Sequence, residues 1–343
     1  MLTFCTLFDS NYLDKGLVLY ESMEKVMSEY KLYVLAMDEK CNAILRTMKL
    51  PHMVVISTEE FEDKELLEIK RQRTRAEYCW TCTASLIAYV FKTYQEEFCT
   101  YVDSDLFFYK NPQILIQEMC NSGCSVQIVE HGFGNNWCAK EKERRAGKYC
   151  VEFNTFKNDI YGREILDVWN RQCRNHCSMA PGEMGDQKYL SDWNEKYDKV
   201  HVLQHQGAGV APWNLFRFKQ AEKGVLLDKK TKEKIELVFY HFHHLEFIDE
   251  ETININVYKK EFGCDKKLVE RIYIPYLEKL QTAKKTLQCD FGITPMITKH
   301  PGVAGNNEKK NVQKMSIKEF FWKAKYKVVY MAGTKKDIIK MRR

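Results

Sequence analysis

Apolar positions along the first 110 residues follow two alternating periods. Runs rich in β-branched and aromatic residues predict strands at residues 2–10, 31–38, 52–57 and 98–109. Between these strands, apolar residues recur at helical spacing over residues 14–30, 43–50 and 59–94, the last region in two pieces. Strands that alternate with helices predict an α/β fold with a parallel, Rossmann-like sheet. Ligands of such sheets bind beyond the carboxyl ends of the strands, so we expect the polar ends of the first and fourth strands to face one crevice.

After Pro112 the pattern is less regular. Short strands are predicted within 124–131, 148–159, 199–215 and 235–247, and helices within 162–177, 183–197 and 264–287. We therefore expect a main domain over 1–255, a helix packed on it over 256–290, a linker over 291–315 and a basic tail over 316–343.

The tail carries the basic character of the chain, because residues 308–343 contain twelve Lys and Arg against three Asp and Glu. Apolar residues recur there at helical spacing: Ile317, Phe320, Phe321, Ala324, Val328 and Met331. A basic amphipathic helix of this kind is typical of contact with an anionic membrane surface. A terminal helix docked on its own domain explains the pattern equally well.

Composition narrows the class of protein. The 343 residues are 45% hydrophobic and 29% charged, and no stretch approaches the roughly 20 apolar residues of a membrane span. No export signal is recognisable, so we expect a cytoplasmic protein, at the inner face of the membrane if the tail binds lipid, with no nucleic-acid partner. Thirteen cysteines are then expected to be reduced. A zinc site in "CRNHC" (173–177) fits the common ligand spacings poorly, which favours buried thiols.

Two carboxylates interrupt the fourth apolar run, "TYVDSDLFFY". Side chains of a strand alternate between its faces, so Asp103 and Asp105 should project to the same side at the strand's end. Two convergent carboxylates repel each other unless a cation or a proton lies between them. Mg²⁺ and Mn²⁺ favour such oxygen ligands, and Mg²⁺ commonly adds oxygens of a substrate phosphate.

Several segments resemble nucleotide-sugar-dependent glycosyltransferases of the GT-A fold, especially glycosyltransferase family 8. The likeness covers roughly residues 1–250 and is carried by "TLFDSNYLDKGLVLYESM", "TYVDSDLFFYKNP", "GDQKYLSDW" and "FYHFHHL". The chain is also similar to bacterial nucleotide-diphospho-sugar transferases whose substrates are mostly unassigned. Two further segments, "WTCTASLIAYVF" and "HVLQHQGAGVAPWNL", contribute to this second resemblance. The resemblance implies a GT-A fold with a mixed central sheet and a C-terminal helical extension.

The resemblance also implies a metal site. Asp103 and Asp105 would bind Mn²⁺ or Mg²⁺, which bridges the donor diphosphate in this family. A late-strand histidine completes the shell in the family; His241 fits it, and His243, two residues later on the same face, is the second candidate. His244 stands where the family has Gly, so phosphate contacts at this end are expected to differ.

Nucleotide contacts are implied for Thr6, Asp9, Asn11, Tyr12, Arg75, Asp103 and Ser104. Tyr12 would stack on the base, while Arg75 or the nearby Arg73 would meet phosphate or sugar. An ordinary Asx turn leading into the first helix is the alternative explanation of "FDSNY".

Asp186 and Gln187 match the pair that lies near the reacting carbon in this family, where an oxygen stabilises developing positive charge. A helix N-cap is the alternative role of Asp186. The same resemblance suggests sugar or acceptor contacts for Asn154, His205, Trp213 and Asn214.

The sequence thus predicts a metal-dependent hexosyltransferase that moves a sugar, most readily from a UDP-sugar, to a saccharide or other hydroxyl acceptor. Retention of configuration and a role in bacterial surface glycan synthesis follow from the resemblance. A Mg²⁺-dependent phosphatase of the haloacid dehalogenase type also uses Asp-x-Asp, but on its first strand and followed by Thr or Val. A non-catalytic sugar-binding protein is a further alternative.

Overall fold

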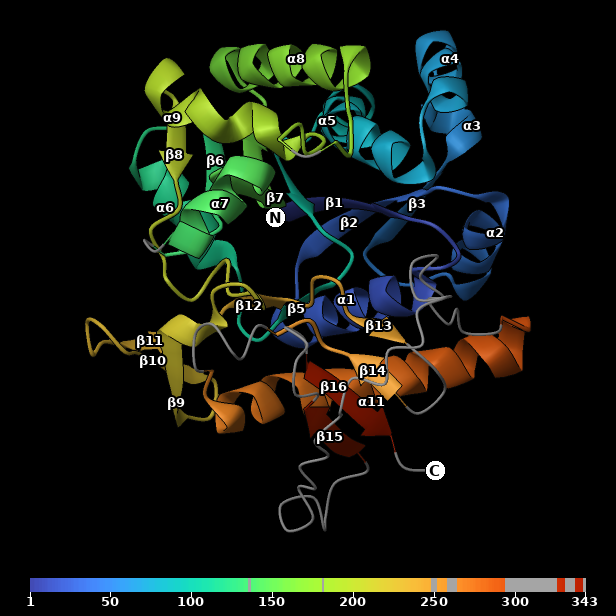
Figure 1. The fold of residues 1–343 in the computed structure, drawn as a ribbon. Coiled ribbons are helices and arrows are strands. Elements are labelled where there is room, and N and C mark those ends of the chain that lie inside the picture. The colour runs from blue at the N-terminus through green and yellow to red at the C-terminus, as the bar shows by residue number, and fades with distance from the viewer. Residues whose placement is uncertain are drawn as a thin grey trace.

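The computed structural model describes residues 1–134, 137–180, 182–247, 252–257, 264–293, 326–330 and 337–341. Its centre is a seven-stranded sheet in the order β3-β2-β1-β4-β7-β6-β8 (Figure 1). The strands are β1 (Leu2–Phe8), β2 (Tyr30–Ala36), β3 (Met53–Ser57), β4 (Phe98–Val102), β6 (Val126–Glu130), β7 (Tyr149–Lys157) and β8 (Val200–Val202). β7 runs antiparallel to both of its neighbours, and the other pairs are parallel. The mixed α/β class predicted from the sequence is confirmed.

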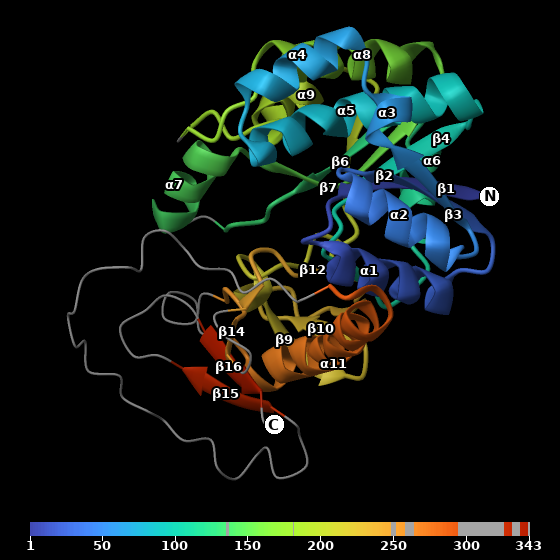
Figure 2. The same cartoon turned by 90° about the vertical axis from the view of Figure 1, so that its right-hand side faces the viewer.

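Helices cover both faces of this sheet. On one side lie α3 (Thr58–Phe61), α4 (Lys64–Gln72), α5 (Arg75–Tyr94) and α8 (Ile160–Asn175), and on the other α1 (Leu13–Val26) and α11 (Lys266–Phe291), as Figures 1 and 2 show. The faces have separate cores, one around Trp169 and Trp193 and the other around Tyr240, Tyr273 and Tyr276. Strands β1 and β4 are buried on both faces, which explains why their sequences are almost continuously apolar.

The remaining described helices are short and lie around this framework. They are α2 (Glu39–Met48), α6 (Gln113–Asn121), α7 (Trp137–Ala146), η1 (Gln187–Asp192), α9 (Trp193–Lys196) and η2 (Leu215–Arg217). Smaller sheets are formed by β9 (Phe218–Glu222), β10 (Val225–Asp228) and β11 (Lys234–Glu236), and by β5 (Leu106–Phe108) with β12 (Phe239–His241).

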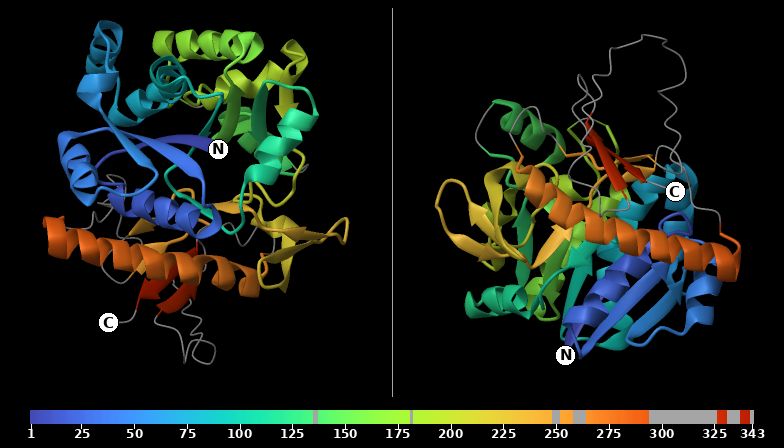
Figure 3. Two further views of the ribbon diagram at one scale, coloured as in Figure 1. Left: turned by 180° about the vertical axis from the view of Figure 1, so that it is seen from behind. Right: turned by 90° about the horizontal axis from the view of Figure 1, so that it is seen from below.

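The predicted helix at 264–287 is α11, which crosses the face of the molecule opposite α5 and α8 (Figure 3). It begins at the N-cap Asp265, whose carboxylate accepts a bond from the Lys267 amide, and it ends at Gly292 with a φ of 63°. Ion pairs Lys279–Glu21 (2.7 Å) and Lys284–Asp14 (3.1 Å) join it to α1.

Two predicted elements of the first half are subdivided. The run 98–109 is not one strand, because the chain turns at Asp103–Asp105 and β5 continues in a different sheet. A turn lets the two carboxylates leave the buried strand, where their desolvation would be costly. The helical region 59–94 forms three helices, and capping boxes begin α3 at Ser57 and α5 at Thr74.

The tail differs from its prediction. Tyr326–Tyr330 and Asp337–Met341 form strands β15 and β16, and β16 pairs with β14 (Thr252–Asn254), which pairs with β13 (Glu246–Phe247). The helical prediction is therefore wrong for these ten positions, where "KVV" and "DII" bring β-branched residues together. The rest of 316–343, and the linker beyond residue 293, lie outside the described residues. In the described ranges no helix combines the length and apolar character needed to cross a bilayer.

Candidate metal and nucleotide site

Asp103, Asp105 and His241 meet at the turn between β4 and β5. Antiparallel pairing of β5 with β12 places His241 opposite Leu106, and the Phe242 amide donates to the Asp105 carbonyl oxygen at 2.9 Å. His241 Nε2 lies 3.1 Å from Asp105 Oδ1 and 3.6 Å from Asp103 Oδ2. The two predicted carboxylates and the predicted histidine are thus brought together, although they come from segments more than 130 residues apart.

The other nitrogen of this imidazole has its own carboxylate. His241 Nδ1 lies 2.5 Å from Oε2 of Glu152, a fully buried residue of β7. Burial alone would lower the pKa of His241. Asp105, through charge and a hydrogen bond, and hydrogen bonds with Cys150 and Glu152 together raise it well above its ordinary value. Burial also raises the pKa of Asp103, and the Asp105, Asp186 and Glu152 carboxylates add to that rise.

The three residues fit a divalent cation. Their candidate ligand atoms all lie within 4.8 Å of one another, so a small movement would place two carboxylate oxygens and one imidazole nitrogen around an ion. The Asp103 side chain is 29% exposed, whereas the His241 side chain is 3% exposed, so the cluster is open on the carboxylate side only. A histidine ligand held by a carboxylate at its second nitrogen is a common arrangement in metal sites.

His243 lies apart from this cluster. Its ring faces Trp213, with centroids 5.1 Å apart, and burial together with the neighbouring His244 and His241 lowers its pKa well below the ordinary value. Within the described chain, the carboxylate pair gathers with His241 and not with His243. The geometry therefore favours His241, and ligation itself stays a prediction.

Asp186 follows a tight turn beside α5. Gly185 has a φ of 47°, and a Cβ there would lie 2.4 Å from the Trp80 ring, so this close approach requires glycine. Asp186 is buried, and burial raises the pKa of its carboxyl to about 7 despite a hydrogen bond from Thr83 that lowers it. Asp186 stands at the N-cap position of η1, but its side chain makes no capping bond there. The side-chain amide Nε2 of Gln187 donates to the Ala146 carbonyl oxygen at 2.6 Å.

The predicted nucleotide residues lie at the end of β1. Asp9 Oδ1 accepts from the Asn11 amide at 2.8 Å, which is the Asx turn of the alternative explanation, and Asp9 Oδ2 pairs with Arg75 at 2.5 Å. Arg75 also pairs with Asp38, at 3.0 Å. Tyr12 is 42% exposed, with Lys15 Nζ lying 4.2 Å from its ring centroid. A flat, accessible ring beside charged groups is compatible with base stacking.

Thr6, Ser104 and Asn154 are buried near these groups. The hydroxyl of Thr6 and both side-chain polar atoms of Asn154 have no hydrogen-bond partner among the described residues. Buried polar atoms of this kind are rare in folded proteins, and they are available to a ligand. Roles in nucleotide or sugar binding remain predictions for all three.

The predicted acceptor residues fall into two places. Trp213 Nε1 and Asn214 Nδ2 each donate to the His131 carbonyl oxygen at 2.8 Å, and both residues are buried, so these groups hold a loop in place. His205 lies elsewhere, on a surface hollow of about 590 Å³ beside α6, where its amide donates to Glu118 at 3.2 Å. Direct acceptor contacts by these three residues stay untested.

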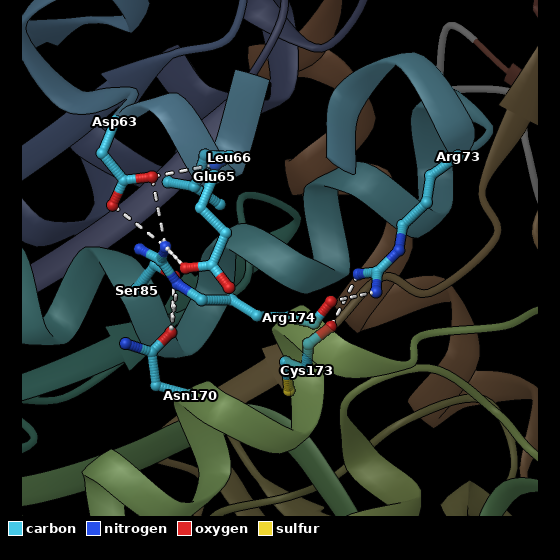
Figure 4. A network of polar contacts seen from close by, with 8 residues as sticks. All are labelled: Asp63, Glu65, Leu66, Arg73, Ser85, Asn170, Cys173 and Arg174. Carbon is cyan, nitrogen blue, oxygen red and sulfur yellow. Dashed lines mark hydrogen bonds and ion pairs between the residues drawn. The ribbon is translucent and has the colours of Figure 1, made fainter. Parts of the chain in front are cut away.

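Arg73 makes contacts within the protein, which favours Arg75 of the two arginines as the residue that would meet phosphate or sugar. It donates to the carbonyl oxygens of Cys173 (2.6 Å) and Arg174 (2.5 Å) at the end of α8, as Figure 4 shows. Figure 4 also shows Arg174 bound to Asp63 and Glu65, which ties α8 to the start of α4. Arg73 thereby satisfies carbonyl groups that a helix terminus leaves unbonded.

The zinc alternative in "CRNHC" is not supported by the described residues. Cys173 and Cys177 are buried thiols, while the exposed His176 ring bonds to Glu183 at 3.1 Å. Burial raises the pKa of the Cys177 thiol to about 12, which disfavours the thiolate that zinc requires.

Sequence reasoning missed Glu152 and Asp38. Glu152 interrupts the buried run "YCVEFNTF" just as Asp103 interrupts its own, and that signal was present. Asp38 was harder to recognise from the sequence, because it also caps α2, where its side chain accepts from the Cys41 amide.

Comparisons with known proteins give the following similarities. No family model matches the chain. Two Bacillus subtilis proteins described as uncharacterised, YfnD and YfnF, are 27% and 28% identical to it over 295 and 298 residues, covering 84% of this chain and 91% and 95% of their own lengths.

Three solved structures to which the chain is similar are described as glycosyltransferases. The galactosyltransferase LgtC, in complex with donor and acceptor sugar analogues, has a TM-score of 0.47 at 12% identity over 82% of this chain and 96% of its own. The glycosyltransferase GlyE of Streptococcus pneumoniae has a TM-score of 0.45 at 14% identity over 82% of this chain and 62% of its own. Mouse xyloside xylosyltransferase 1 has a TM-score of 0.40 at 15% identity over 59% of this chain and 84% of its own.

Proposed function

We propose that the protein is a metal-dependent glycosyltransferase that uses a nucleotide-diphosphate sugar, with UDP as the nucleotide. The observation that carries the proposal is the convergence of Asp103 and Asp105 on His241, at the carboxyl end of the sheet strand β4. The sequence resemblance to GT-A enzymes assigns the same three positions independently of that geometry.

Asp103, Asp105 and His241 would hold Mn²⁺ or Mg²⁺. When bound, the ion supplies positive charge that stabilises the departing diphosphate. Asp9 and Asn11 at the end of β1, with the exposed ring of Tyr12, would bind the nucleoside. The charge of Lys15 in α1 acts to lower the pKa of both Tyr12 and Asp105, which supports a common site for the nucleoside residues and the carboxylate pair.

Asp186 would act at the sugar. Besides burial, its charge raises the pKa of Asp103 and of Tyr101, which supports a role near the carboxylate pair. An ionised Asp186 would stabilise positive charge at the anomeric carbon during transfer, and its pKa of about 7 makes that state dependent on pH near neutrality. The family resemblance further implies that the transfer retains the anomeric configuration of the donor sugar, and we include this in the proposal.

The acceptor is proposed to be a saccharide or other hydroxyl compound of bacterial surface glycan synthesis, with the protein in the cytoplasm or at the inner face of the membrane. The phosphatase alternative is not favoured, since Asp103 and Asp105 follow the fourth strand of the chain and Leu106 follows the pair. An assay of nucleotide release distinguishes a transferase from a sugar-binding protein that does not turn over its ligand.

The test is a calorimetric screen of UDP- and GDP-sugars with Mn²⁺, followed by an assay of nucleotide release. We expect one UDP-sugar to bind only with metal present, and its metal-dependent cleavage to disappear in Asp105→Ala and His241→Ala. Arg163→Ala, an exposed position on α8, is the control and should keep full activity. Failure of every nucleotide sugar to bind, or turnover that survives both substitutions, would refute the proposal.

A further inference from the structure

Glu152 occupies an unusual position for a carboxylate. It is fully buried in the centre of β7, and among the described residues no Lys or Arg pairs with it. Oε2 bonds to His241, while Oε1 has no hydrogen-bond partner in the part of the chain that the structure describes. A buried carboxylate is costly unless a charge or donor compensates it, so its presence in the buried part of β7 needs an explanation.

The backbone around Glu152 is shaped to aim this side chain. The pairing of β6 with β7 shifts register between Gln127 and Val129, and the extra residues on β7 lie between Cys150 and Thr155. Such bulges redirect side chains and are frequent near active sites. Gly209 leaves the room that the carboxylate needs, because a Cβ at that position would lie 3.2 Å from Glu152 Oε1.

Residue 152 contacts both halves of the cluster. Its carbonyl oxygen accepts from the Asp103 amide at 3.1 Å, which fixes the backbone where the chain turns out of β4. Its carboxylate bonds to His241 Nδ1 at 2.5 Å. One residue of the central sheet therefore sets the position of an aspartate and the orientation of the imidazole.

We propose that Glu152 is a positioning residue for the cation site: it holds His241 with the proton on Nδ1, so that Nε2 is left to bind the divalent ion between Asp103 and Asp105. The inference rests on the metal site of the proposed function and adds a residue that this function does not require by itself. A carboxylate at this place both selects the tautomer and makes the imidazole a better donor to the ion.

Substitutions test this role through metal affinity. Glu152→Gln keeps the volume but removes the charge, and its amide group can donate to Nδ1 and so favour the wrong tautomer. Glu152→Ala removes the contact. Calorimetry with MnCl₂ alone should show affinity reduced by about 10- to 100-fold in both variants, the range typical of residues that orient a metal ligand.

Glu118→Gln is the matched control. Glu118 accepts from another histidine, His201 Nε2, at 2.6 Å, so it forms the same type of pair away from the cluster. We expect its Mn²⁺ affinity to stay within about twofold of the wild type, whatever the change in melting temperature. A purely structural role of Glu152 predicts instead that its variants lose thermal stability and, where folded, bind Mn²⁺ normally.

A second measurement uses the unaltered protein and does not depend on how variants fold. With histidine labelled with ¹⁵N and Mg²⁺ bound, the resonances that disappear in His241→Gln should report a protonated Nδ1 and an unprotonated Nε2. The opposite tautomer, or a folded Glu152→Gln protein with wild-type Mn²⁺ affinity, overturns the inference.

These outcomes are separable from those of the proposed function. If the wild type binds Mn²⁺ through these residues but transfers no sugar, the proposed function fails and the role of Glu152 stands. If the wild type transfers sugar but binds no Mn²⁺, the role of Glu152 fails while the transferase activity stands.

Discussion

Asp186 gives a stability prediction that needs no knowledge of the substrate. Its carboxyl is buried, with 5% of the residue exposed, and burial raises its pKa to about 7 against a reference value of about 3.9. A group whose folded-state pKa is raised contributes stability that is fully present below its unfolded pKa. That contribution is lost as pH rises through the folded pKa, so Asp186 should destabilise the fold progressively from about pH 4 to pH 7.

The size of the effect follows from the two pKa values. Relative to strongly acidic pH, ionisation of this residue in the unfolded chain lowers the free energy of unfolding by about 1.5 kcal/mol at pH 5 and by about 4 kcal/mol at pH 8. Asp186→Asn does not titrate and can still accept the Thr83 hydroxyl. The free energy of unfolding of Asp186→Asn minus that of the wild type should therefore increase by about 2–3 kcal/mol between pH 5 and pH 8.

Urea denaturation, followed by tryptophan fluorescence at pH 5, 6, 7 and 8, measures this difference directly. Asp192→Asn is the control, because Asp192 is exposed at the end of η1, and its difference from the wild type should not change with pH. A difference for Asp186→Asn that stays flat from pH 5 to pH 8 would show that the buried carboxyl does not titrate near neutrality, and the reasoning would be refuted.

Further predictions concern the cation and the contacts of α8. Because carboxylates raise the pKa of His241 well above its usual value, a cation must displace a proton, so Mn²⁺ affinity should fall as pH falls and calorimetry in buffers of different ionisation enthalpy should show proton release at pH 7. Proton uptake on binding would contradict this. Arg73→Ala should lower the free energy of unfolding by about 2–3 kcal/mol, because two carbonyl groups lose their donor, whereas the exposed Arg71→Ala should change it by less than about 0.5 kcal/mol in urea denaturation. Equal effects of the two substitutions would show that the Arg73 contacts add no stability.

The sequence was sufficient for the parallel half of the fold because the signals there are local. Strands β1, β2, β3 and β4 are apolar runs separated by helices, and the right-handed crossover rule leaves few ways to arrange them. The second half depends on contacts that no local pattern reports. β7 enters next to β4 in the antiparallel sense, and β5 leaves the main sheet to pair with β12. Those choices are made by packing of distant segments.

The tail is a case in which the spacing of apolar residues predicts the wrong secondary structure. The apolar spacing from Ile317 to Met331 fits a helix, yet the described segment 326–330 is a strand in a small sheet. A short run such as "YKVVY" satisfies both periods at once, and its β-branched pair favours the extended state once a partner strand is available. The partner strand, β16, also lies in the tail. The choice between helix and strand at 326–330 therefore depends on pairing with a neighbouring segment, which the spacing of apolar residues does not report.

Charged residues within apolar runs were enough to locate the candidate site, but they did not identify all of its members. Asp103 and Glu152 each interrupt an apolar strand, and each interruption signals a compensating group, although the sequence does not say which group or where. In the fold, both carboxylates and Asp105 converge on the single imidazole of His241, 89 residues from Glu152. One imidazolium cannot balance three carboxylates, so the cluster carries excess negative charge that a proton on Asp103 or a bound cation would compensate. A divalent ion bound there would replace the proton of Asp103 and the proton on His241 Nε2, so metal binding is the proposal that best explains so costly an arrangement of charges.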